Sequence, residues 1–129
     1  MKPSDFQFSD PRIEKIDFRI GKNKKEQNLP IGIEVQTKVN NKQSNAIVRL
    51  FLTVGEIDSE NEVITPFYFN GTILADFRWQ GNFDDESIEN MLRINGGTVL
   101  LSYIRPILAT ITMQAGIKPL NLPFINFMK

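Results

Sequence analysis

Apolar and polar residues alternate along the first part of the chain, and this pattern predicts β-strands with one buried face. A first strand is expected within residues 6–20, broken near Pro11, with apolar side chains at Phe6, Phe8, Ile16, Phe18 and Ile20. A second is expected over residues 31–39, where apolar residues take every other position. Residues 46–54 are apolar at nearly every position, which predicts a central strand covered on both faces.

Residues 62–80 are rich in aromatic and β-branched side chains, but Asn70-Gly71 lies in their middle. This dipeptide is a strong local signal for a two-residue hairpin turn. A bulge in one long strand is the alternative. Local chemistry alone favours the hairpin.

After Asp84 the apolar residues take helical spacing, and a first helix is expected to stop at Asn95-Gly96-Gly97, where left-handed backbone is tolerated. A second helix is expected over residues 98–115, with Gly116 as its stop. Strands followed by helices indicate an α+β fold, in which two helices pack on one face of an antiparallel sheet. We expect residues 1–129 to form a single domain.

The second expected helix is apolar around more than one stripe, and a small domain cannot bury such a helix against one sheet alone. We therefore expect a homo-oligomer held by this helix. The candidate interface residues are Leu100, Tyr103, Ile104, Ile107, Leu108 and Ile111.

Residues 116–129 are too apolar for a solvated tail. Chain ends usually fray unless they are tied down, so this segment is expected to dock on the domain or on a partner subunit. Pro119 and Pro123 favour extended backbone before them. Phe127 is expected to fill a pocket.

Cysteine and histidine are both absent. Disulfides, thiolate nucleophiles, Cys/His metal sites, the commonest general base and the serine triad are thereby excluded. Gly96-Gly97 is not followed by the Lys-Ser/Thr of a phosphate loop. Asp84-Asp85-Glu86 suits a helix N-terminus better than a hard-cation site. We expect no enzyme, no cofactor and no metal.

Basic and acidic residues number 15 each, which gives no electrostatic case for nucleic acid or for an anionic membrane surface. The lysines of residues 22–25 are better explained as a solvated loop. Residues 1–11 lack the features of a signal peptide, and no apolar run approaches the ~20 residues that span a bilayer. A cytoplasmic protein is expected.

The helix and the tail together resemble the SecB export chaperone family. That family has a four-stranded antiparallel sheet, a long helix with a Tyr-x-Arg step, and then a segment Gly-x-x-Pro-Leu-Asn-Leu-x-x-Val-Asn-Phe. The step is matched here by Tyr103 and Arg105. The segment is matched, with Ile125 in place of Val, by Gly116, Pro119, Leu120, Asn121, Leu122, Asn126 and Phe127.

The resemblance implies one bent strand through Asn70-Gly71, and this overrides the local preference for a hairpin. It also implies four main strands, dimers that join their sheets, and a tetramer in which two dimers meet through the long helices. The family docks on the SecA motor through acidic side chains on the exposed sheet face. This chain is neutral and its carboxylates do not match one for one, so a SecA partner is doubtful.

By this resemblance the protein is expected to be an ATP-independent chaperone, a holdase for unfolded or extended polypeptide in protein transport. The candidate client-binding residues are Phe67, Phe69, Phe77, Trp79, Phe124 and Phe127. An aromatic residue at strand spacing lies in the core more often than it contacts a client. Two alternatives stay open: a dedicated chaperone for one partner such as an antitoxin, and an oligomeric scaffold without client binding. A toxin–antitoxin pair beside the gene would favour the first.

Overall fold

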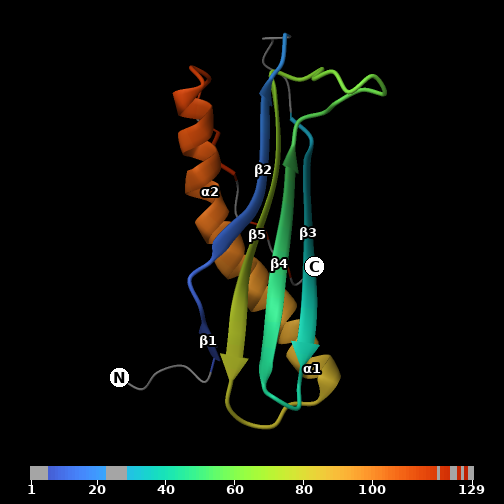
Figure 1. The fold of residues 1–129 in the computed structure, drawn as a ribbon, viewed down its shortest axis with the longest axis vertical. Coiled ribbons are helices and arrows are strands. Elements are labelled where there is room, and N and C mark those ends of the chain that lie inside the picture. The colour runs from blue at the N-terminus through green and yellow to red at the C-terminus, as the bar shows by residue number, and fades with distance from the viewer. Residues whose placement is uncertain (1–5, 23–28, 119, 123–124, 126, 128–129) are drawn as a thin grey trace.

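One antiparallel sheet underlies the fold in the computed structural model, which describes residues 6–22, 29–118, 120–122, 125 and 127. Its strands are β1 (Phe6–Phe8), β2 (Arg12–Ile20), β3 (Ile31–Asn40), β4 (Asn45–Val54) and β5 (Phe67–Trp79). β1 and β2 pair with β5 end to end, and β4 and then β3 follow on the other side of β5 (Figure 1). β1 and β2 thus form one edge strand interrupted around Pro11, so the sheet has the four expected strand positions.

β5 runs without a turn through Asn70-Gly71, which confirms the bent strand and excludes the hairpin. The backbone at this point is paired on both sides, with Asp17 and Ile16 of β2 and with β4. A Cβ on Gly71 would lie 2.7 Å from Cζ of Phe69, so a larger side chain has no room there. The glycine is explained by this close approach rather than by turn geometry.

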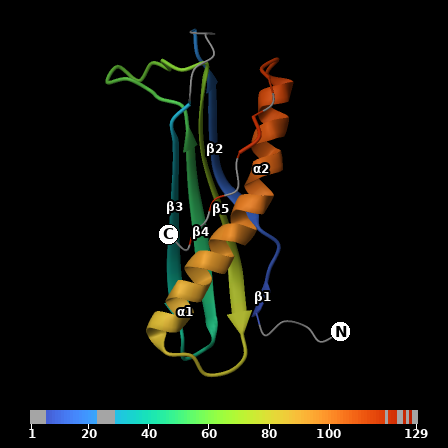
Figure 2. The same ribbon diagram turned by 180° about the vertical axis from the view of Figure 1, so that it is seen from behind.

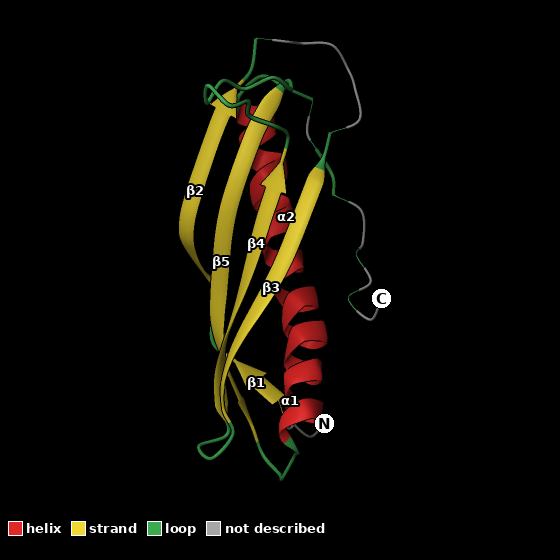
Figure 3. Cartoon of the chain, turned by 90° about the vertical axis from the view of Figure 1, so that its right-hand side faces the viewer, coloured by secondary structure: helices red, strands yellow, loops and turns green. Residues whose placement is uncertain are grey.

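The helical part is one continuous helix, and the expectation of two separate helices is wrong. α1 (Asp85–Met91), the π-helical segment η1 (Leu92–Gly96) and α2 (Gly97–Gln114) follow one another without a break. Figure 3 shows this helix as a second layer against the sheet. It crosses the sheet diagonally, from β3 and β4 at its N-terminal end to beside β2 at its C-terminal end (Figures 1 and 2).

Gly96 and Gly97 do not stop the helix, because both have right-handed helical backbone, with φ of −63° and −59°. Both are buried. A Cβ on Gly96 would lie 3.0 Å from Cγ1 of Val48, and one on Gly97 would lie 3.2 Å from Cγ2 of Val35. The glycines therefore let the helix come close to β4 and β3. The wide π-helical turn lies at the same approach.

Both helix termini are capped. At the N-terminus the Asp84 carboxylate accepts a hydrogen bond from the Ser87 backbone N–H at 2.7 Å, which confirms the capping role and lowers the pKa of Asp84. At the C-terminus Gly116 has φ of +74°. Its N–H donates to the Met113 carbonyl at 3.1 Å, and the Ile117 N–H donates to the Thr112 carbonyl at 3.0 Å. These two bonds form a Schellman motif, so the predicted stop at Gly116 is confirmed.

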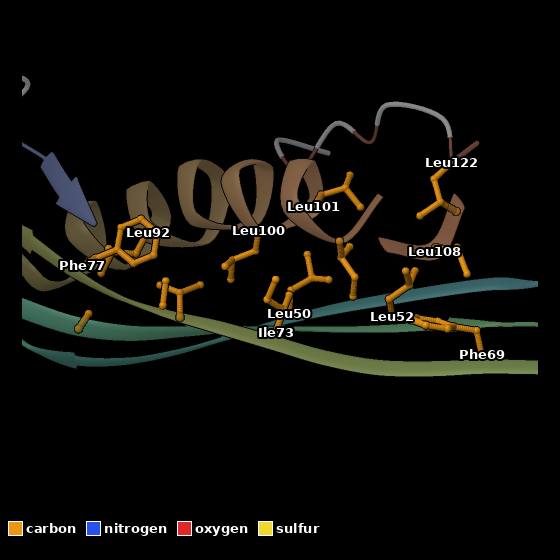
Figure 4. Close-up of a cluster of buried hydrophobic side chains, with 14 of the residues drawn as sticks. Leu50, Leu52, Phe69, Ile73, Phe77, Leu92, Leu100, Leu101, Leu108 and Leu122 are labelled. Carbon is orange, nitrogen blue, oxygen red and sulfur yellow. The ribbon is translucent and has the colours of Figure 1, made fainter. Parts of the chain in front are cut away.

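The hydrophobic core lies between the helix and the inner, helix-facing side of the sheet (Figure 4). The tail contributes to it: Leu122 is 2% exposed, and Leu120, Ile125 and Phe127 pack against the same cluster. The Leu120 N–H donates to the buried Thr112 hydroxyl at 3.1 Å, which fixes the tail to the helix end. The predicted docking of the tail is confirmed for these residues, whereas Pro119, Pro123 and Phe124 lie outside the described residues.

Candidate functional site

The predicted client-binding residues on β5 lie in the core. Phe67, Phe69, Phe77 and Trp79 have exposed fractions of 2%, 0%, 3% and 4%. They are buried because β5 is paired along both edges and its inner face is covered by the helix and by neighbouring strands. A client could therefore reach them only after a covering element moved. Phe127 is half-buried and its carbonyl accepts from Arg93 Nη1 at 2.9 Å, while Phe124 lies outside the described residues.

The predicted interface residues on the helix divide between two faces. Leu100, Ile104 and Leu108 are at most 1% exposed, because they face the sheet. Tyr103 is 43% exposed, and Ile107 and Ile111 are half-buried. Leu100, Ile104 and Leu108 thus belong to the core of the protomer, and Ile111 packs against it. Tyr103 and Ile107, and the exposed part of Ile111, lie where a partner could still contact them.

The sequence alone does not reveal the most exposed apolar surface, which lies on β1 and β2. Phe8, Ile13, Ile16 and Ile20, here called the apolar edge, are 44%, 44%, 40% and 57% exposed. Their partners in β5 are inward-facing residues, so the apolar edge faces the helix side of the sheet. The helix passes beside β2 instead of covering it (Figure 2). Alternation predicted an inward face correctly, but it could not show that the helix leaves that face open.

The helix continues this apolar surface. The ring of Tyr103 meets the ring of Phe8 edge-on, with 6.4 Å between their centroids, and Met113 is 55% exposed. By length and composition alone, the helix Asp85–Gln114 is apolar enough to cross a membrane, yet one face of it packs on the sheet. Its open face and the apolar edge together form the kind of surface at which proteins bind other polypeptides.

The outer face of the sheet, turned away from the helix, carries paired charges. Arg49 lies 3.0 Å from Glu14, and the carboxylate raises the pKa of the guanidinium. Arg12 lies 3.1 Å from Asp76. Arg19 lies 3.3 Å from Asp17 and also stacks over the ring of Tyr68. These exposed pairs contribute little to stability, but they place an arginine beside Glu14, Asp76 and Asp17.

β4 is predicted from the sequence to be covered on both faces, but only its inner face is covered. Its inward residues are buried, whereas its outward residues, such as Ile47, Arg49 and Phe51, are only half-buried. The expected cover on both faces is therefore wrong, because no second layer lies on the outer side within the described structure (Figure 3).

Among the described residues there is no group of three or more acidic side chains that could hold a metal ion.

Comparisons with known proteins agree with this architecture. The model of a family described as preprotein translocase subunit SecB matches residues 5–129. A search of the curated proteins found no match. Among solved structures, the Mycobacterium tuberculosis SecB-like chaperone Rv1957, in complex with a ChAD peptide from the HigA1 antitoxin, matches with a TM-score of 0.74 and 15% identity. That match covers 94% of this chain and 88% of the other.

A second solved structure, a protein of unknown function from Streptococcus agalactiae, matches with a TM-score of 0.52 and 12% identity. The match covers 92% of this chain and 97% of the other. At these identities the two structures establish a shared fold: an antiparallel sheet covered by a long helix. They do not carry over what either protein binds.

Proposed function

Because the chain belongs to the SecB family, we propose that it is an ATP-independent holdase for unfolded or extended polypeptide. The observation that supports this most is the apolar edge. Edge strands of natural proteins are usually protected by charges, prolines or covering elements, because an open edge pairs with other chains. Here the ion-paired charged residues of β2 lie on the outer face of the sheet, and Ile13, Ile16 and Ile20 stand exposed on its inner face.

Binding would proceed by strand addition. An extended client segment lies beside β2 and forms backbone hydrogen bonds with it, while alternate client side chains contact the isoleucines. No nucleotide is needed, because the client leaves when its own folding competes successfully for the same apolar residues. No catalytic role is proposed, in keeping with the chaperone character of the family.

The parent protein is expected to suppress the aggregation of several unrelated, chemically unfolded clients without nucleotide, at about one protomer per client. The double variant Ile16→Ser, Ile20→Ser should lose most of this effect, since it removes two exposed apolar side chains without opening a core cavity. Light scattering during client refolding measures the effect. The variant Gln36→Ser, Lys38→Ser, on the outer face of β3, is the control and should act like the parent. Equal activity of the isoleucine variant would contradict the role of the apolar edge.

A dedicated chaperone for a single partner is the second candidate function. The likeness in fold to an antitoxin-binding SecB-like chaperone favours it. The ion pairs of the outer face also favour it, because an arginine beside Glu14, Asp76 and Asp17 weakens the electrostatic attraction of these carboxylates for a SecA-like motor. The same assay separates the two functions, because a dedicated chaperone would leave unrelated clients to aggregate. An oligomeric scaffold without client binding would also fail this assay and would bind no antitoxin peptide.

We also propose a cytoplasmic homo-oligomer, a tetramer by analogy with the family, held through the open face of the helix. Replacing Tyr103 with glutamate is expected to reduce the mass of the assembly, since a carboxylate in an apolar interface is costly unless it is paired. Multi-angle light scattering of the parent and the variant measures this. The exposed substitution Thr110→Glu, a polar position on the same helix, is not expected to add a comparable cost. A parent that is monomeric at micromolar concentration would overturn the proposal.

A further inference from the structure

β1 differs from the other strands in how it is held. It consists of only Phe6–Phe8, pairs with Phe77–Trp79 at the end of β5, and is separated from β2 by Ser9, Asp10 and Pro11. Its attachment is mainly aromatic. Phe6 stacks on Trp79 with 6.2 Å between ring centroids, and Phe8 stacks on Phe77 at 5.7 Å. β1 therefore occupies the β5 edge as a short segment with aromatic residues two positions apart.

The surroundings complete an aromatic receptor for such a segment. Phe6 also contacts Phe83, in the loop before the helix, at 5.8 Å between ring centroids. Phe8 meets Tyr103 of the helix. The rings of Phe77, Trp79, Phe83 and Tyr103, which we call the aromatic acceptor, thus surround the two side chains of β1. Edge-to-face and offset-stacked ring pairs of this kind add to simple apolar burial.

The pairing of β1 with β5 departs from a regular ladder at one end. There the Ser9 N–H donates to the Asp76 carbonyl at 2.9 Å, but the Asp76 N–H donates to the Ser9 hydroxyl at 3.0 Å, where a regular antiparallel partner would present its backbone carbonyl. At the other end the Trp79 indole Nε1 is buried and has no hydrogen-bond partner among the described residues. A buried indole N–H normally finds an acceptor. An extended client segment could supply a backbone carbonyl in place of the Ser9 hydroxyl.

We propose that the β5 edge at Phe77–Trp79 is an exchangeable strand site, which takes an extended client segment with aromatic residues at positions i and i+2 in place of β1. This proposal rests on the proposed holdase function and names the segment chemistry that the site prefers. It also gives Phe77 and Trp79 a route to the client: their rings contact Phe8 and Phe6 of the neighbouring β1 in the free protein, and displacement of β1 would expose that side of them.

A reversible lock tests the exchange. Gln7 and Arg78 face each other across β1 and β5, both are exposed, and the chain contains no cysteine. Opposite Cα atoms in antiparallel strands lie about 4.5–5.5 Å apart, within the range that a disulfide bridges. The full-length variant Gln7→Cys, Arg78→Cys should therefore hold β1 in place when oxidised and release it when reduced.

The probe is a fluorescein-labelled peptide, Lys-Thr-Phe-Thr-Phe-Thr-Lys, with a matched peptide in which serine replaces both phenylalanines. In the Ile16→Ser, Ile20→Ser background, which weakens the apolar edge on β2, we expect the oxidised lock variant to bind the Phe-Thr-Phe peptide about tenfold more weakly than the reduced variant does. The variant Phe6→Ser, Phe8→Ser should bind it more tightly than the parent, because the competing segment is weakened. The serine peptide should bind none of these proteins at the same concentrations.

Equal binding by the oxidised and reduced forms would overturn the exchange, and suppression of client aggregation by both forms would then leave the holdase function standing. Conversely, lock-dependent peptide binding with no suppression of aggregation would support the exchange site and overturn general holdase activity. A disulfide that forms between two chains, seen as a dimer on a non-reducing gel, would show that the site takes β1 of a second copy and would overturn the client assignment.

Discussion

Replacing Ile104 with glutamate is expected to unfold the protein, not to separate folded subunits. Ile104 is 1% exposed, and its Cδ1 atom lies near Gly71 of β5, 3.4 Å from the place of a Cβ there. Ile104 belongs to the buried hydrophobic cluster, so the new carboxylate would lie in apolar surroundings. Such burial costs several kcal/mol, whereas a domain of this kind is stable by only about 5–15 kcal/mol.

Urea unfolding followed by circular dichroism measures this effect. Tyr103→Glu is the matched control: it introduces the same charge one residue away, at a position that is 43% exposed, so the chain should stay folded. A folded Ile104→Glu protein with the mass of a smaller assembly would mean that Ile104 faces a partner subunit. The sequence-based assignment of Ile104 to the interface would then be right after all.

Removing residues 119–129 is expected to destabilise the protein strongly. The deletion takes away Leu122, which is 2% exposed, together with Leu120, Ile125 and Phe127 of the same cluster. Leu122→Ala alone should cost about 2–5 kcal/mol, because it leaves a cavity in a packed core. The deletion also removes the donor to the buried Thr112 hydroxyl and the acceptor for Arg93.

Thermal and urea unfolding of the deletion and of Leu122→Ala check this prediction. Asn121→Ala, next to Leu122 but exposed, should leave stability nearly unchanged. If the deletion unfolds at the same temperature as the parent, the tail does not contribute to the core, and its apolar residues are better explained as a peptide that binds a partner.

Periodicity and end signals predicted most of the fold because they depend on local chemistry. Alternation located the strands, Asp84 marked the helix start, and Gly116 marked its end, where a left-handed backbone requires glycine. The glycines inside the fold have roles that their local sequence does not indicate. Gly71, Gly96 and Gly97 resemble turn and stop residues in sequence, but Gly71 makes room for the ring of Phe69 and the end of Ile104, and Gly96 and Gly97 let the helix approach Val48 and Val35. That reason depends on tertiary contacts, which a local window does not contain.

The candidate site was less predictable, because it depends on how one layer lies on the other. Phe67, Phe69 and Ile16 all sit on the inward side of neighbouring strands, yet the first two are buried and the third is 40% exposed. The difference comes from the diagonal course of the helix, which leaves β2 uncovered (Figure 1). No pattern along the chain encodes that angle, so the sequence could not show that the inward residues of β2 stay exposed.

The pairing of β2 with β5 has a consequence for how the chain folds. Arg12 pairs with Leu74 and Ile20 with Phe67, although β3, β4 and their loops lie between these strands in sequence. β2 can therefore pair with β5 only after distant parts of the chain have come together. Pairing across such long sequence separations is slow, whereas the helix forms through local contacts. We therefore expect β2, which carries Ile13, Ile16 and Ile20, to pair late in folding and to stay exposed until then. At that stage it resembles the segments that the folded protein is proposed to hold, so finished copies can protect unfinished ones.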